Sequence, residues 1–280
     1  MRTLAVLLAG LAAVALTVQK PAKSPHAADF RPLLMRPAFA RTLSKPILPM
    51  LVDLLWLRAI NAIGLKDSKE KNLALYEYGV VITELDPRFR TAYEFIGLNI
   101  PFAVARNTFV GGDLSCDMFR RGLKAYPNDR TLMMYLGFSL MHHERKFSEA
   151  SDVFARAAQL PDALPWMGLL ATRLKSHSGE AEDALELTRH LLESELEPDV
   201  RSELEKRVEE LAIEVVLQRV DRAVSDFRAR YGRAPESLDE LTRSGLYDGT
   251  VFDPAGGLIS FGPDGKATST SLTRRLEIYE

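Results

Sequence analysis

The chain contains two stretches that align with each other: AYEFIG (92–97) with SCDMFRRGLKAYPND (115–129), and LMMYLG (132–137) with EASDVFARAAQLPD (149–162). Each contains an aliphatic residue followed by a glycine, Ile96-Gly97 and Leu136-Gly137. Each continues with a small residue, an aromatic residue, a second small residue and a closing proline: Ser115, Phe119, Gly122 and Pro127, then Ala150, Phe154, Ala157 and Pro161. A pattern repeated at this spacing predicts consecutive pairs of helices.

The closing prolines give the length of the repeat. They stand at 87, 127, 161 and 198, so the intervals are 40, 34 and 37 residues. The longest interval contains IPFAVARNTFVGGD (100–113), in which Pro101 and the pair Gly111-Gly112 interrupt the helical periodicity. We therefore expect an extended loop between two helices here, apolar enough to pack against them.

These features resemble the tetratricopeptide repeat over roughly residues 50–198. The resemblance implies that the glycine of each repeat lets two helices approach closely, while an aromatic residue such as Phe154 fills the space between them. It also implies that first-helix residues line a concave groove that binds a segment of a partner protein. In this sequence the matching positions are Thr91, Glu94, Leu98, Thr131, Met134, Phe138, Met141 and His142.

The expected fold is mainly α: a tetratricopeptide-like α-solenoid of about three helix pairs over 48–198. A first, degenerate pair contains Trp56, and a third pair contains Trp166. Apolar residues at helical spacing then predict a long capping helix over 199–230. Turn signals between short apolar runs predict a small helix and a β-hairpin over 231–280.

The C-terminal stretch RAVSDFRARYGRAPESLDEL (222–241), with FDPAGG (252–257) and PDGKATS (263–269), resembles the globular end of type II secretion pseudopilins. In that family the turn that follows the helix can hold calcium. The positions that the resemblance offers here are Asp253 and Asp264. The helix start that is typical of pseudopilins is missing.

The N-terminal residues differ from the rest in charge and hydropathy. An uncharged run from Leu4 to Val18 follows one arginine, which predicts that residues 1–19 are a signal peptide or an N-terminal membrane anchor. Residues 20–47 contain five prolines and six basic residues, so we expect a linker. This linker either contacts anionic headgroups or is an ordinary soluble spacer. The expected location is the periplasm or the periplasmic face of the inner membrane; the alternative is the cytoplasmic face.

Charge and motif content argue against several classes of function. Residues 1–50 carry seven Lys or Arg and one Asp, whereas the remainder has a net charge of −8, so we expect no nucleic-acid partner. The single Cys116 allows no disulfide framework. His142-His143-Glu144 lacks the second histidine of the zinc-protease pattern, because Phe147 occupies that position. No nucleophile elbow, phosphate loop or dinucleotide motif is present, so no cofactor, metal or small-molecule substrate is expected.

Three hypotheses follow. The first is a non-catalytic scaffold of the bacterial envelope that binds a protein partner through the groove and contacts the membrane through its N-terminal segment. The second is a subunit of a secretion, pilus or surface-assembly apparatus, in which residues 231–280 make the working contact. The third is a hydrolase or metal-dependent enzyme that uses the histidines.

Overall fold

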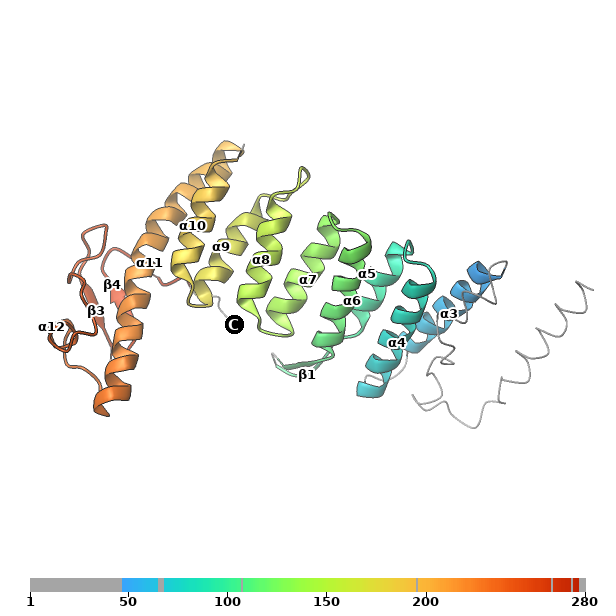
Figure 1. Cartoon of the computed structure of the whole chain (residues 1–280), viewed down its shortest axis with the longest axis horizontal. Coiled ribbons are helices and arrows are strands. Elements are labelled where there is room, and N and C mark those ends of the chain that lie inside the picture. The colour runs from blue at the N-terminus through green and yellow to red at the C-terminus, as the bar shows by residue number, and fades with distance from the viewer. Residues whose placement is uncertain are drawn as a thin grey trace, which may run out of the picture. The chain divides into compact units, whose positions relative to one another are not determined.

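The structure is a computed structural model that describes residues 47–64, 68–106, 108–194, 196–262, 264–272 and 274–276. The predicted signal peptide or anchor (1–19), and all of the predicted linker except its last residue, lie outside the described residues. The chain divides into two compact units, residues 1–92 and 93–280, and each is described by itself. The prediction of a mainly helical chain is confirmed (Figure 1).

The helices of the described residues are α3 (Leu48–Ile63), α4 (Lys69–Leu85), α5 (Arg90–Asn99), α6 (Gly112–Ala125), α7 (Arg130–His142), α8 (Phe147–Ala158), α9 (Trp166–His177), α10 (Ala181–Leu192), α11 (Pro198–Tyr231) and α12 (Leu238–Arg243). The strands are β1 (Phe102–Ala105), β2 (Thr108–Val110), β3 (Ile259–Phe261) and β4 (Ala267–Ser269). No helix of the described residues has the length and hydropathy that crossing a membrane requires.

In the first unit, α3 packs against α4. The hydroxyl of Ser68 accepts a hydrogen bond from the amide of Lys71 (3.1 Å) and so caps the start of α4. Trp56 of α3 packs against Phe89, with ring centroids 5.1 Å apart. The tryptophan therefore anchors α3 to the residues that follow α4.

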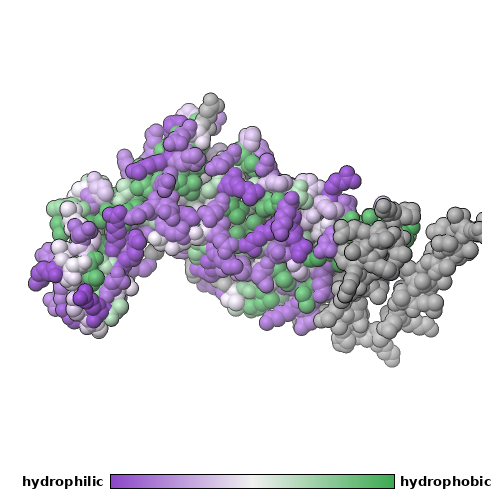
Figure 2. All heavy atoms as spheres, in the orientation of Figure 1, coloured by the Kyte–Doolittle hydropathy of each residue, from purple (hydrophilic) through white to green (hydrophobic). Residues whose placement is uncertain are grey.

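In the second unit, each of the helices α6 to α11 packs against the next one in sequence, and Figure 1 shows them side by side. Figure 2 shows hydrophobic side chains reaching the surface between rows of hydrophilic ones on one face of these helices. Asp129 begins α7 by accepting a hydrogen bond from the amide of Leu132 (3.0 Å). The start of α7 thus follows the N-cap rule, and the packing joins neighbours in the sequence.

Two glycines bring helices of this unit into close contact. A Cβ on Gly97 of α5 would lie 2.6 Å from Cε1 of Phe119 in α6. A Cβ on Gly137 of α7 would lie 2.6 Å from Cε2 and Cζ of Phe154 in α8. Both phenylalanines are almost fully buried. The same contact therefore occurs in both aligned stretches, and each phenylalanine ring occupies the space that a Cβ would fill.

The segment expected to be an extended loop contains a β-hairpin instead. β1 and β2 pair antiparallel, with Phe102 opposite Val110 and Ala103 opposite Phe109. Most of β1 is exposed, including Val104 at 55%. Aromatic and β-branched residues such as Phe102, Phe109 and Val110 favour paired strands, and here this preference outweighs the interruption by Pro101 and the Gly111-Gly112 pair. The expected packing occurs in part, since the ring of Phe109 contacts that of His143 with centroids 4.7 Å apart.

The C-terminal segment shares one hydrophobic core with α11. β3 and β4 pair antiparallel, with Ile259 opposite Ser269, and an isolated bridge joins Phe252 to Leu258. The core combines residues from α11, α12, both strands and the segment between them: Ile213, Leu217, Val220, Ala223, Val224, Phe227, Leu238, Leu241, Tyr247, Ile259 and Ala267. Residues 231–280 are therefore not a module that packs independently of α11.

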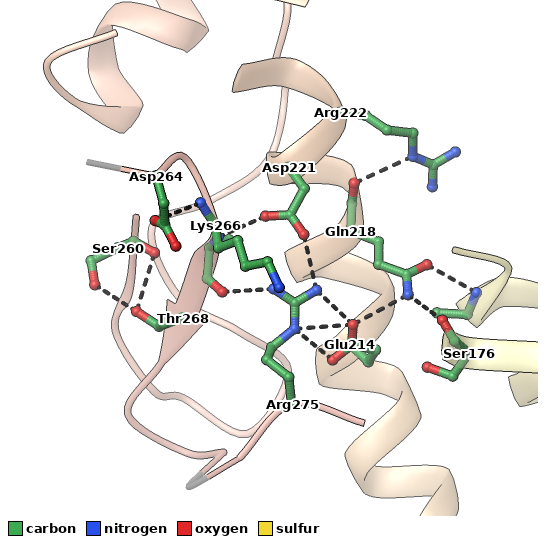
Figure 3. A network of polar contacts seen from close by, with 12 residues as sticks. Ser176, Glu214, Gln218, Asp221, Arg222, Ser260, Asp264, Lys266, Thr268 and Arg275 are labelled. Atoms are coloured by element: carbon green, nitrogen blue, oxygen red, sulfur yellow. Dashed lines mark hydrogen bonds and ion pairs between the residues drawn. The ribbon is translucent and has the colours of Figure 1, made fainter. Parts of the chain in front are cut away.

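A buried ionic network joins Arg275, near the C-terminus, to the same helix (Figure 3). Arg275 donates hydrogen bonds to Glu214 (2.6 Å at its shortest), to Asp221 (2.9 Å) and to the carbonyl of Ala267 (2.7 Å). The side chain of Glu214 is 4% exposed and that of Arg275 is 16% exposed. Burial by itself would lower the pKa of Arg275, but Glu214 and Asp221 raise it above its usual value. Arg275 is therefore charged and compensates two carboxylates.

The network continues from α11 to the helices before it. Gln218 donates to Glu214 (3.2 Å) and to the carbonyl of Ser176 (2.8 Å), and it accepts a hydrogen bond from the amide of Ala181 (3.0 Å). These last two groups belong to the end of α9 and the start of α10. One polar side chain thus joins three helices, and the ion pair beside it holds the C-terminal segment.

We expect Gly137→Ala to destabilise the protein, because the added methyl group collides with the Phe154 ring. Overpacking of this kind costs about 1–3 kcal/mol, of which up to about 1 kcal/mol is offset by the better helix propensity of alanine. Urea unfolding measures the difference. Gly64→Ala is the control, since its Cβ would meet nothing closer than the carbonyl oxygen of Asn61 at 3.6 Å. Equal changes in the free energy of unfolding of the two variants would contradict the steric explanation.

We expect Arg275→Met to cost about 3–5 kcal/mol of stability, because it leaves Glu214 buried without its cation. The double variant Glu214→Gln/Arg275→Met removes both charges and should recover much of that loss. Urea unfolding of the two variants and the wild type measures the difference. A single variant as stable as the wild type would show that the pair adds nothing.

Candidate functional site

The structure places the eight residues predicted to line a groove in different environments. Thr91 belongs to the first unit and is exposed. In the second unit, Leu98 is 46% exposed and His142 is also exposed. Four more are half-buried: Glu94, Thr131, Met134 and Phe138.

Met141 does not fit the prediction, because it is only 8% exposed and belongs to the core. Helical spacing predicts that the Met141 side chain points in nearly the same direction as those of Met134 and Phe138. Spacing gives the direction of a side chain on its own helix, but neighbouring elements decide whether that side chain is covered. Met141 is therefore a packing residue and offers little surface to a partner.

Three of the predicted residues meet at a small cavity of about 110 Å³. Leu98 comes from α5, while Phe138 and His142 come from α7. Phe119 of α6 and Tyr135 of α7 complete its apolar wall, and their rings stack with centroids 5.8 Å apart. The cavity therefore joins residues of α5 and α7, the helices that contain Gly97 and Gly137.

Aromatic rings hold Phe138 beside this cavity. Its ring centroid lies 5.3 Å from that of Phe154, 5.7 Å from that of Trp166 and 6.1 Å from that of His142. Phe154 and Trp166 also touch each other at 5.8 Å. Rings at these distances pack favourably, so the exposed His142 stands next to a fixed aromatic group. The periodicity of α9 does not predict that Trp166 reaches α7.

The polar side of the cavity is a chain of hydrogen bonds that sequence reasoning missed. The amide nitrogen of Pro101 carries no hydrogen, so it cannot bond the carbonyl of Gly97 one helical turn earlier. The buried hydroxyl of Ser115 donates to that carbonyl instead (2.7 Å). The hydroxyl of Ser139 in turn donates to Ser115 (3.1 Å) and lies 3.0 Å from Nδ1 of His143. One feature of the sequence indicated part of this series: Ser139 and His143 are four residues apart, so they lie on the same face of one helix.

The donor and acceptor roles in this series of hydrogen bonds determine what chemistry it can support. Ser115 uses its proton on Gly97, and Ser139 uses its proton on Ser115. Each hydroxyl has one proton, so Nδ1 of His143 must donate to Ser139. A general base would have to accept the serine proton, which is the reverse arrangement. Ser139 is also only 3% exposed. The chain therefore stabilises the end of α5 and does not activate a nucleophile.

Burial shifts the titration of two groups beside the cavity. It lowers the pKa of His143, and the neighbouring His142 lowers it further. Burial raises the pKa of the Cys116 thiol, and this effect exceeds that of the hydrogen bond with Ser139. His143 is therefore held neutral near pH 7, and Cys116 stays a thiol.

The carboxylate of Asp253, one of the two positions considered for calcium, is occupied by internal donors. Oδ1 accepts hydrogen bonds from the amides of Ala255 (2.8 Å) and Gly257 (3.0 Å), while Oδ2 accepts one from the hydroxyl of Ser269. Burial acts to raise the pKa of Asp253, but these hydrogen bonds lower it overall. Asp264 accepts a bond from the amide of Lys266 (3.1 Å). Over the part of the chain that the structure describes, no three His, Cys, Asp or Glu side chains are grouped to hold a metal ion.

His143 should make stability depend on pH. Its pKa is lower in the folded than in the unfolded chain, so the unfolded chain binds more protons and stability falls as pH drops below the unfolded value of about 6.5. We expect wild type to lose more stability between pH 7.5 and 5.5 than His143→Gln does, measured by urea unfolding. The matched control is His190→Gln, since His190 is exposed beside Glu193. A His143→Gln variant with the wild-type pH dependence would refute this.

Comparison with known proteins adds no relative. No known protein family matches the chain, and no curated protein matches it.

Proposed function

We propose that the chain is a non-catalytic scaffold that binds a segment of a partner protein over the mouth of the α5–α7 cavity. The observation that carries the proposal is the convergence of Leu98, Phe138 and His142 at that cavity. A cavity of about 110 Å³ accommodates roughly one aliphatic side chain. Two of its lining residues, Leu98 and His142, are exposed. Such a site suits a docked peptide better than a substrate that must be enclosed.

In this proposal, α5 to α10 form a tetratricopeptide-like array and α11 caps it. The repeated glycine–phenylalanine contact supports this arrangement, because the sequence resemblance assigns the same role to both residues. The shared core with residues 231–280 gives the outer face of α11 a covering that an end helix needs. The first-helix faces would then line the concave side.

The proposal keeps the expected location. Residues 1–19 would direct or tether the chain to the bacterial envelope, and the array would face the periplasm. The absence of a nucleophile arrangement in the Ser139–His143 pair supports a non-catalytic role over a hydrolase. Among the described residues, no particular contact favours the secretion-subunit hypothesis, in which residues 231–280 make the working contact.

Site-specific photocrosslinking tests the binding surface in cells. We expect a photoreactive residue at Leu98 or at His142 to give the same discrete adduct, because both positions face one cavity. A photoreactive residue at Lys124, which is exposed on α6 outside the cavity lining, is the control and should not give that adduct. Different adducts from positions 98 and 142, or an identical one from 124, would contradict the proposal.

A further inference from the structure

Helix α3 leaves one apolar face uncovered by the described residues. Its opposite side carries the buried Val52, Ala59 and Ala62, and the helix packs against α4. The uncovered side chains follow one another at spacings of three and four residues, so they lie on one face of the helix and its N-cap. We call this set the α3 apolar face, and its exposed fractions lie between 38% and 65%: Ile47, Met50, Leu54, Leu57 and Ile60.

One acidic group interrupts the α3 apolar face. Asp53 is exposed, three residues after Met50 and four before Leu57, so it lies among these side chains. It also lines a cavity of about 490 Å³ at the start of α3, together with Asp86 and Arg88. Two carboxylates thus stand against one guanidinium at this end. The face therefore suits an apolar segment that also carries basic residues.

Size and charge argue against two possible occupants of this face. A second copy of the chain would need more surface, because specific interfaces involve about 20–30 residues a side and this face has five apolar side chains. Helices that lie on a lipid surface have a polar side rich in lysine and arginine. In α3, Asp53 and Arg58 are the only charged residues. A segment of the same chain needs less contact area, because its tether gives it a high effective concentration.

The chain contains such a segment immediately before α3. Residues 30–46, FRPLLMRPAFARTLSKP, lie outside the described residues. Six of these 17 residues are large and apolar, four are basic and none is acidic. The α3 apolar face is about 20 Å long from Ile47 to Ile60, at the helical rise of about 1.5 Å per residue. A chain of 17 residues exceeds this length in a helical or an extended conformation, so the segment can reach the whole face.

We propose that residues 30–46 fold back along α3 and cover its apolar face, with a basic side chain of the segment paired with Asp53. The driving force is the removal of Met50, Leu54 and Leu57 from water. The segment would then belong to the helical body and would not be the spacer that its prolines suggest. This inference involves none of the residues at the α5–α7 cavity, so it does not depend on the crosslinking result.

Limited trypsin digestion of the full-length protein tests the proposal. Three of the four basic residues of the segment precede a proline, where trypsin does not cut, so Arg41–Thr42 is its cleavable bond. A bond held against α3 is cut slowly, because cleavage requires the segment to detach first. We expect Leu54→Ser/Leu57→Ser to accelerate cleavage after Arg41 at least tenfold. Asp53→Lys should accelerate it several-fold, because it replaces the attraction by repulsion.

Two controls show whether the change is confined to the proposed contact. The Lys23–Ser24 bond precedes the segment and should be cut at the same rate in the wild type and in every variant. Leu73→Ser alters another exposed leucine, which belongs to α4 and lies outside the α3 apolar face. It should leave the rate of cleavage after Arg41 unchanged.

Several results would overturn the proposal. One is cleavage after Arg41 at the same rate in the wild type and in both face variants. Another is protection of Arg41 that increases with protein concentration, which would assign the face to a second copy of the chain. A third is protection that arises only when anionic phospholipid vesicles are added, which would assign it to a lipid surface. Should the double serine variant fail to fold, Asp53→Lys decides the question, since it removes no apolar side chain.

Discussion

The missing Cβ at Gly97 and Gly137 is the constraint on which the helical packing depends. At each position a phenylalanine ring occupies the space where a side chain would begin. The close approach buries Phe119 and Phe154, and those rings in turn position the aromatic residues of α7. Burying a side chain of this size stabilises by about 1.5–3 kcal/mol relative to exposure, so two glycines control much of the energy of these contacts. The cavity beside Phe138 is a consequence of the same packing.

Polar side chains supply partners to buried polar groups that the apolar contacts leave unsatisfied. Pro101 deprives one helical carbonyl of its donor, and the Ser115–Ser139–His143 chain supplies it. At the other end, Glu214 is buried and requires Arg275, which is 61 residues away in sequence. In both places a group that would be unsatisfied is compensated by a residue from a different element. Arg207 is compensated only in part: its Nε forms an ion pair with Glu210 at 3.4 Å, but its buried Nε and Nη1 make no hydrogen bond among the described residues.

The proposed binding surface is the cavity near Leu98. It is small, lined mainly by apolar side chains and flanked by the exposed imidazole of His142. In the proposal, its shape and apolar lining would select the side chain of a partner segment.

The sequence by itself determined the helices, their proline-delimited ends and the glycine–phenylalanine pairs, since these depend on local periodicity, capping and sterics. It also identified Leu98, Phe138 and His142, which the structure brings together at one cavity. Only the tertiary structure decided that Met141 is covered, that β1 pairs with β2, and that Arg275 reaches Glu214. The reason is physical. Burial and charge compensation depend on which distant element lies against a side chain, and a single helix's periodicity contains no information about its neighbours.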